Sequence, residues 1–239
     1  MAIKENSFFQ YEETRALSGY KSAWLVKRSG EEFYSMVGLT ESVPYVFGDK
    51  ETFDFDILQS STKGKVEGKT SLEAQDIEVL HHRDNAYRFE KLKGKTLDFM
   101  VINAEFVGYK FTGTVDYRPN NAEADVNKAT VTITPMSASA TPIYDARGEV
   151  RETLCFKNVI PSTVKTSDAV DFAVKQEVGQ LSIDIKTIAS GTNEEETATA
   201  SNYTITEGTS KVTFTASGLY AITVSGGNYA SWTTTVYVE

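Results

Sequence analysis

The sequence lacks the features that mark several common classes of protein. Its 239 residues include one cysteine, so no internal disulfide can form and no cysteine-based metal framework is available. Lysine and arginine number 24 against 33 acids, and the formal net charge of −9 argues against a protein that wraps nucleic acid through phosphate contacts. No stretch approaches the ~18 apolar residues of a membrane span, and the first ten residues hold no signal-peptide core. We therefore expect a globular protein that folds in the cytosol.

Patterns for catalysis and metal binding are also scarce. There is no nucleophile elbow, no Gly-rich phosphate loop and no Cys/His metal spacing. The neighbours His81 and His82 would point to opposite faces of a strand, and no third ligand completes a site. Asp54 and Asp56 share one face of an expected strand and could divide into acid and base, but exposed acids two residues apart are most often solvated. We expect no catalytic residue, no metal and no cofactor, and hence no enzyme.

One helix is clearly bounded in the sequence, at residues 83–94. Asp84 or Asn85 can cap its start by accepting a hydrogen bond from a free backbone N–H group, and Gly94 can adopt the left-handed conformation that ends a helix. Apolar residues recur on one side at every third position: Ala86, Phe89 and Leu92. This spacing gives the helix one face to bury, and we expect that face to lie against a sheet.

Alternating apolar residues predict the strands of that sheet. The clearest run spans residues 109–117, with Tyr109, Phe111, Gly113, Val115 and Tyr117 on one face and polar residues on the other. Other strands are expected at residues 23–27 and 33–37, which form a hairpin, and at residues 52–58, 72–82, 97–101 and 131–133. Helix and strands together predict a helix packed on an antiparallel sheet.

Two polar segments interrupt this pattern. Residues 1–20 have no strong periodicity, and they are either a loosely ordered terminus or an arm that orders against a neighbouring subunit. Residues 59–71 contain two glycines and three lysines, with almost no apolar anchor. We expect the second segment to be a long flexible loop between strands.

Composition changes near residues 162–168, which predicts two domains, at residues 1–163 and 164–239. From Val164 onward there are fourteen threonines and no arginine, histidine or proline, and four lysines against nine acids give a net charge of −5. Short, regularly spaced strands are expected at residues 181–188, 203–206, 211–216, 220–225 and 233–238, with a turn at residues 225–228 and Trp232 in the core. Residues 218–224 look like the penultimate strand of bacterial immunoglobulin-like domains.

The first domain carries a resemblance to a known family. After one short helix, three segments resemble the major tail tube proteins of long-tailed bacteriophages: residues 97–101 (LDFMV), 108–120 (GYKFTGTVDYRPN) and 132–137 (TITPMS). The resemblance implies a mainly β fold, namely a tail-tube β-sandwich or barrel with one flanking α-helix. The C-terminal immunoglobulin-like β-sandwich would be an appendage of the kind that several such phages carry.

The resemblance also implies a mechanical function. Hexameric rings would stack into a tube that conducts DNA during ejection, and an acidic lumen would repel phosphates; Asp54, Asp56 and Asp116 are candidates for this lining. Contacts between rings would come from the first 20 residues and from the loop that holds Lys63, Lys65, Glu67 and Lys69.

The implied partners are other copies of the chain and the tape-measure, tail-terminator and tail-tip or baseplate proteins. DNA would pass without specific binding, the C-terminal domain would contact glycans weakly, and no membrane insertion is expected. The implied location is the virion tail, after assembly in the host cytoplasm. Two alternatives stay open: an inner-tube component of a contractile injection system, and a bacterial cell-surface protein with an immunoglobulin-like binding module.

Overall fold

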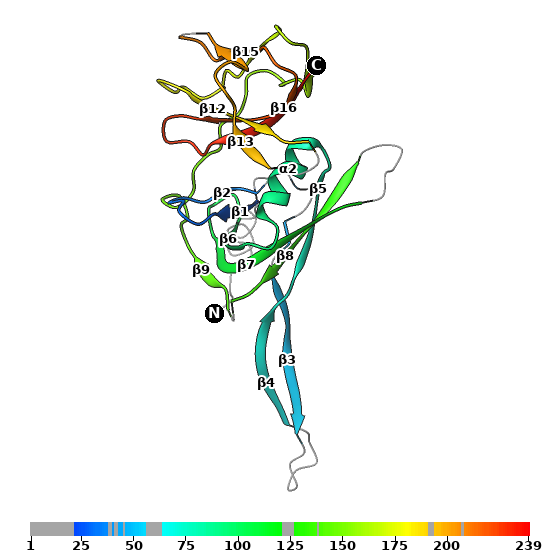
Figure 1. Cartoon of the computed structure of the whole chain (residues 1–239). Helices are drawn as coiled ribbons and strands as arrows, with labels where there is room; N and C mark the ends of the chain where they lie inside the picture. The colour runs from blue at the N-terminus through cyan, green and yellow to red at the C-terminus, as the bar shows by residue number, and fades with distance from the viewer. Residues whose placement is uncertain are drawn as a thin grey trace.

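The computed structural model describes residues 22–239 except 38–39, 41–42, 45, 56–63, 121–126, 138, 191–193 and 207. Within these residues the fold is mainly β, with one helix, as the sequence predicts. Figure 1 shows two bodies of strands, one above the other, with the helix between them and a long hairpin projecting from the lower body. We call the lower body the sheet part and the upper body, built from β10 to β17, the sandwich part.

Seven antiparallel strands form the main sheet of the sheet part, in the order β2-β1-β6-β7-β8-β5, with β9 beside β7. The path runs from β2 to β5 and does not close into a barrel. The strands are β1 (Ala23–Lys27), β2 (Ser35–Met36), β5 (Gln75–Leu80), β6 (Thr96–Ile102), β7 (Gly108–Pro119), β8 (Lys128–Pro135) and β9 (Thr141–Ile143).

Burial along these strands follows the alternation in the sequence. In β7, Phe111, Gly113, Val115 and Tyr117 are buried, and the residues between them are half-buried. The predicted hairpin of β1 and β2 is confirmed by their antiparallel pairing. The strand predicted within residues 72–82 is confirmed as well, because Ile77 and Val79 in β5 lie in the core. Period-two patterning therefore located most of this sheet.

The helix α2 (Arg83–Leu92) packs its apolar face on the sheet. Phe89 is fully buried, and its ring stacks on Tyr117 with 5.3 Å between centroids. Gly94 has φ of +69°, so the predicted left-handed stop is confirmed. The predicted cap is wrong: the helix begins after His82 without a side-chain cap, since Asp84 bonds to a strand of the sandwich part and Asn85 to the carbonyl of Leu80.

Both faces of the main sheet carry apolar residues. On the helix side the core contains Trp24, Phe99 and Phe111, whose rings make edge or stacked contacts with one another. On the other side a smaller cluster contains Leu25, Met100 and Ile102, covered by the segment that follows β9. This explains why Trp24, Leu25 and Val26 are consecutively buried in β1: a strand covered on both faces needs no alternation.

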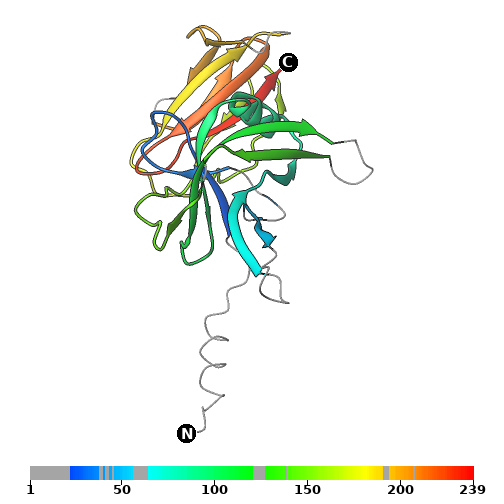
Figure 2. The same ribbon diagram turned by 90° about the horizontal axis from the view of Figure 1, so that it is seen from below.

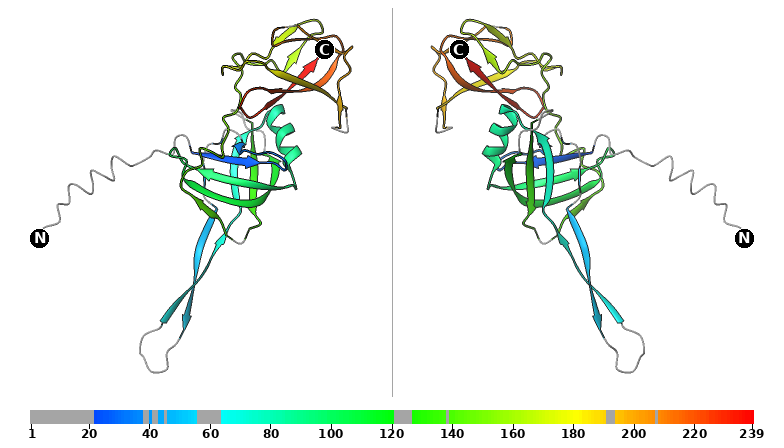
Figure 3. Two further views of the ribbon diagram at one scale, coloured as in Figure 1. Left: turned by 90° about the vertical axis from the view of Figure 1, so that its left-hand side faces the viewer. Right: turned by 90° about the vertical axis from the view of Figure 1, so that its right-hand side faces the viewer.

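A two-stranded ribbon, β3 (Phe47–Phe55) with β4 (Gly64–Leu72), projects from the sheet part, away from the sandwich (Figures 1 and 3). The long loop expected at residues 59–71 is therefore wrong for residues 64–71, which form β4. Its glycines and lysines have low strand propensity, but pairing with β3 satisfies the backbone, and such pairing overrides propensity.

Two further sheets pack face to face in the sandwich part. One has the order β10-β17-β16-β12-β13 and the other β11-β15-β14. The strands are β10 (Thr163–Val164), β11 (Ala169–Asp171), β12 (Ser182–Ile188), β13 (Glu195–Thr197), β14 (Tyr203–Ile205), β15 (Lys211–Phe214), β16 (Gly218–Ser225) and β17 (Trp232–Val238). Phe172, Phe214 and Tyr220 are the large aromatic residues of the shared core.

All five strands predicted for this region are present, within a few residues of their expected ends. The short strands β10, β11 and β13 were missed, because two or three residues carry no readable period. Trp232 was expected in the core; it is half-buried, packs against the sandwich core and also meets Arg88 of α2. Leu154, Phe156 and Ile160 pack in the sandwich core although they precede the predicted boundary, which stays a prediction.

Candidate functional site

The face of the main sheet opposite α2 is polar over strands β5, β8 and β7, and we call it the open face. Strand register fixes its membership: Thr132 lies between Asp76 and Asp116, and Thr130 lies between Glu78 and Arg118. Because side chains alternate along a strand, residues two apart continue the same face. It also carries Asp98, Thr112, Thr114 and Thr134.

Acidic groups on the open face are matched by basic neighbours. Asp116 lies 3.2 Å from the Lys93 ammonium and 3.8 Å from Arg118. The hydrogen bond from Lys93 holds the pKa of Asp116 below its ordinary value, so this carboxylate is ionised at neutral pH. Its charge is nonetheless offset by the two cations. Asp116 by itself therefore contributes little to a repulsive field.

Of the other three acids on the open face, two also pair with a lysine and the third, Asp76, bonds to a hydroxyl group. Glu78 contacts Lys128 at 3.3 Å, and Asp98 contacts Lys27 at 3.9 Å. Asp76 accepts a hydrogen bond of 2.6 Å from the Thr132 hydroxyl. The result is a surface rich in hydroxyl groups with locally balanced charges, which offers no basic cluster for phosphate binding.

The sequence-predicted candidates are divided between two sheets. Asp116 lies on the main sheet, whereas Asp54 lies on β3 of the projecting ribbon, with Lys65 as its cross-strand partner. Asp56 and Lys63 lie outside the described residues. Lys65, Glu67 and Lys69 lie on strand β4 and not in a loop, which corrects the expected position of all three. Asp54 and Asp116 thus lie on strands of different sheets.

Sequence reasoning missed Asp76, Glu78 and Asp98 as members of the open face. The alternation in β5, where Asp76 and Glu78 flank buried Ile77, was the available signal. The pattern shows that these acids share a face, but the register with β8 is needed to place them beside Thr130 and Thr132. Three of the four acids described on this face could therefore be assigned to it only when the pairing of the strands was known.

A second notable place is the joint between α2 and β17. Asp84 in the first turn of α2 accepts three hydrogen bonds: one from the Thr235 N–H at 2.7 Å, one from the Thr235 hydroxyl at 2.6 Å and one from the Thr234 hydroxyl at 2.8 Å. Both threonines are buried. The carboxylate therefore satisfies donors that would otherwise be shielded from water.

Other residues of α2 extend this joint, which lies between the two bodies (Figure 3; Figure 2 gives the view from below). The Arg88 guanidinium lies over the Trp232 ring, 4.2 Å from its centroid, and donates to the carbonyl of Val37. Burial lowers the pKa of Arg88 to about 10, which still leaves it charged at neutral pH. One turn on, Lys91 forms an ion pair with Glu195 of β13. Helix α2 thus contacts both β13 and β17.

The chain that connects the two parts is itself held by backbone hydrogen bonds. Tyr34 donates to Glu149 at 2.8 Å and accepts from Arg151 at 2.9 Å, which attaches this segment to the sheet part. Ala230 donates to Glu152 at 2.9 Å and accepts from Leu154 at 3.1 Å, which attaches the same segment to the sandwich part. Residues 149–154 therefore form a short ladder that bonds to both bodies.

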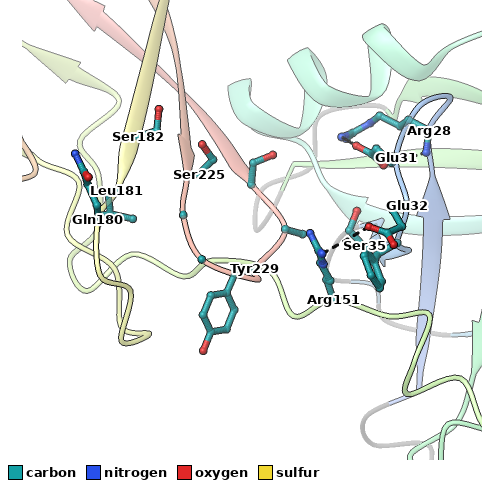
Figure 4. A pocket seen from close by; sticks show the side chains of 15 residues that line it. Arg28, Glu31, Glu32, Ser35, Arg151, Gln180, Leu181, Ser182, Ser225 and Tyr229 are labelled. Carbon is teal, nitrogen blue, oxygen red and sulfur yellow. Dashed lines mark hydrogen bonds and ion pairs between the residues drawn. The ribbon is translucent and has the colours of Figure 1, made fainter.

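A polar cavity of about 720 Å³ opens beside this ladder (Figure 4). Arg28, Glu31 and Glu32, from the turn between β1 and β2, line one wall, and Gln180, Ser182, Ser225 and Tyr229 of the sandwich part line the other. Arg28 pairs with Glu31 at 3.1 Å, and Arg151 with Glu32 at 3.9 Å. The charges are thus paired, and neutral hydroxyl and amide groups are left to face the cavity.

No group of three or more potential metal ligands occurs among the described residues. Over the same ranges, no helix is both long enough and apolar enough to cross a membrane.

Comparisons with known proteins include a distant structural likeness. No protein-family model matches the sequence, and no curated protein matches it either. Among solved structures, the chain is similar to a phage protein whose crystal structure is described as "SPP1 Dit (gp 19.1) Protein, a Paradigm of Hub Adsorption Apparatus in Gram-positive Infecting Phages". The sequences are 11% identical, the TM-score is 0.30, and the match covers 90% of this chain and 78% of that chain. At this level the likeness leaves the function to be argued from the chain's own residues.

Proposed function

We propose that this chain is a structural protein of a phage tail and that its copies polymerise as stacked rings into the tail tube. The resemblance of residues 97–101, 108–120 and 132–137 to tail tube proteins supports the family. The role is mechanical: the chain assembles, encloses the passage of DNA and carries out no reaction. The same features suit the inner tube of a contractile injection system, which is the nearest alternative.

The projecting ribbon is the observation that supports this proposal most strongly. A two-stranded ribbon alone in water is marginally stable. Neither β3 nor β4 has a second partner among the described strands, so each presents an open edge. Open edges of this length invite pairing with another chain. In a stack of rings the neighbouring copy supplies that partner, and Lys63, Lys65, Glu67 and Lys69 stay our candidates for the contact between rings.

The open face suits the lining of a conduit. Its hydroxyl groups and paired charges give a passing phosphate chain no basic cluster to bind. Asp116 stays a candidate for this lining, with Asp54 and Asp56 as candidates from the ribbon. Asp116 is paired with Lys93 and Arg118, so this lining would repel DNA phosphates only weakly. It would let DNA pass mainly because it does not bind the phosphates.

The sandwich part supports an immunoglobulin-like appendage. Its first sheet contains β10 parallel to β17, followed by β16, β12 and β13, and its second contains β11, β15 and β14. The orders β17-β16-β12 and β11-β15-β14 are similar to the GFC and BED strands of an immunoglobulin-like domain, whereas the first strand, β10, pairs with β17 and does not join the second sheet. Tyr220, near the start of β16, donates from its hydroxyl to the carbonyl of Ala216 at 2.9 Å, in the manner of the tyrosine corner of that fold. We place this part on the outside of the tube.

Weak contact with neutral glycans is the ligand class that best fits the sandwich part. The cavity of Figure 4 offers the hydroxyl groups of Ser182 and Ser225, the Gln180 amide and the Tyr229 phenol ring. Hydroxyl, amide and aromatic groups without a free charge suit a neutral polyol better than an ion. The remaining proposed partners are the tape-measure, tail-terminator and tail-tip or baseplate proteins, in the virion tail.

Electron microscopy and sedimentation of the purified chain test the tube proposal. The full chain should form rings or hollow tubes when concentrated or when the tail-tip complex is added. The decisive variant replaces residues 47–72 with an Asn-Gly turn. The Glu73 N–H already bonds the Val46 carbonyl at 2.7 Å, so the body should close without the ribbon.

This ribbon-less chain should stay folded but unassembled. A control, Gly148→Ala, changes a residue with open space around it and should assemble normally. Tubes formed without the ribbon would remove the observation on which the proposal rests. A full chain that stays monomeric at every concentration, even with the tail-tip complex, would refute the tube function.

A further inference from the structure

An apolar cavity of about 670 Å³ lies at the end of the main sheet, beside the joint with the sandwich part. Its walls include Leu25, Met36, Ile102, Phe106, Val150 and Trp232. Leu25 and Ile102 belong to the smaller core cluster, so the cavity continues the core on that face of the sheet. The segment after β9 covers only part of this face, and Met36 at the mouth is 43% exposed. Apolar surface that is left open in this way indicates a docking site.

The N-terminal segment is the part of this chain best placed to cover it. Residues 1–21 lie outside the described residues and end two positions before Ala23, which itself lines the cavity. The segment contains an aromatic cluster, Phe8-Phe9-Gln10-Tyr11, followed by Glu12-Glu13. We propose that this segment docks in the cavity, with Phe8 and Phe9 against the apolar wall and the two acids beside the arginines at its rim.

Charge and reach agree with this occupant. Arg147 and Arg151 lie among the cavity residues together with Glu152. Arg147 pairs with Asp145 at 3.3 Å, but its side chain is 66% exposed and such exposed pairs are weak, so an approaching carboxylate can compete for it. About eleven residues separate Tyr11 from Ala23 and extend to at most about 40 Å, which is long enough to return to the same chain or to reach an adjacent copy. A free aromatic-acidic segment and an apolar cavity with basic residues at its rim are thus complementary.

The thiol of Cys155 provides a direct readout, because it lines this cavity and is exposed. It is also the chain's one cysteine. The rate at which the unassembled full chain reacts with a bulky maleimide should be at least about tenfold lower than the rate of a chain lacking residues 1–19. A tenfold protection corresponds to about 1.4 kcal/mol of docking free energy.

Two variants of the segment distinguish docking of the aromatic cluster from a general effect of the terminus. The double variant F8D/F9D should react as fast as the shortened chain, because buried carboxylates would oppose docking. Ile3→Asp makes the same kind of change outside the aromatic cluster and should stay protected. At the cavity mouth, Met36→Asp should also lose protection, with an unchanged circular dichroism spectrum as the check on folding.

A peptide of residues 1–18 added to the shortened chain should restore protection and change the fluorescence of Trp232, since Trp24 is buried elsewhere. Equal reaction rates in the full and shortened chains would overturn the proposal. So would protection of the shortened chain that rises with its own concentration, because the occupant would then be the surface of a second copy. These measurements use unassembled protein, so their outcome does not depend on whether the chain forms tubes.

Discussion

Replacing Asp84 tests whether the joint couples the sheet part to the sandwich part. The carboxylate accepts three hydrogen bonds from Thr234 and Thr235, both of which are less than 5% exposed. A buried donor left without a partner costs about 1–3 kcal/mol. Asp84 itself is half-buried, so water can replace part of what is lost. We therefore expect Asp84→Ala to lower the free energy of unfolding by about 3 kcal/mol, and Asp84→Asn by about half of that.

Urea unfolding followed by tryptophan fluorescence measures this loss. Trp24 reports on the core of the sheet part, and Trp232 reports on the joint. If the joint holds the two bodies in one cooperative unit, Asp84→Ala should split a single transition into two. Combining it with Thr235→Val gives a double-mutant cycle, in which a coupling energy above about 1 kcal/mol isolates the direct contact.

Glu90→Ala is the matched control, since it removes an exposed carboxylate from the same helix. It should change the free energy of unfolding by no more than about 0.5 kcal/mol. If Asp84→Ala behaved like this control, the three hydrogen bonds would not stabilise the joint, and the reasoning would be refuted.

Three further predictions concern single sites. Gly108→Ala should destabilise the chain by about 3 kcal/mol or more in thermal unfolding, because the added Cβ would overlap the Val101 carbonyl, whereas Gly148→Ala, with open space around it, should be neutral. Tyr220→Phe should cost about 1 kcal/mol in urea unfolding, through loss of the hydrogen bond to Ala216; no change would show that the bond contributes nothing. The Ser210 hydroxyl, 2.6 Å from Asp171, holds the pKa of that carboxyl below its ordinary value, so its stabilisation is present above about pH 4 and is lost as pH falls through the lowered folded value. Asp171→Asn should therefore lose less stability than the unaltered chain between pH 7 and pH 3, and equal losses would contradict this assignment.

Most strands and the helix could be predicted from the sequence because their burial is local and periodic. From Phe111 to Tyr117 in β7 and throughout β8 each buried residue is two positions from the next, and in α2 the buried residues are four and three positions apart. Gly94 could be predicted because its φ is set by the end of the helix. The spacing of apolar residues does not predict an element whose structure is set by something other than burial. Strand β4 is held by its pairing with β3, and its lysines and glycines resemble a loop in the absence of that partner.

The candidate site was harder to predict than the strands and the helix, because it is formed by contacts between residues far apart in sequence. Asp84 was expected to cap its own helix, but its partners Thr234 and Thr235 lie about 150 residues away, and no local pattern encodes such a pairing. The same holds for the contact between Arg88 and Trp232, which are also far apart in sequence. On the open face the sequence supplied Asp116, whereas its neighbours followed from strand register.

The ladder at residues 149–154 has a consequence for transplanting the sandwich onto another protein. A graft that begins at Val164 would leave behind Leu154, which is buried in the sandwich core, and Phe156 and Ile160, which pack against it. The core surface that they cover would be exposed in the recipient. A graft that begins near Glu149 would carry these residues, but it would also take Arg151, which bonds to Tyr34 of the donor. Neither starting residue therefore separates the sandwich from the sheet part without breaking contacts. Exchange between proteins should succeed only when the recipient offers a strand like the one around Tyr34 to receive the incoming chain.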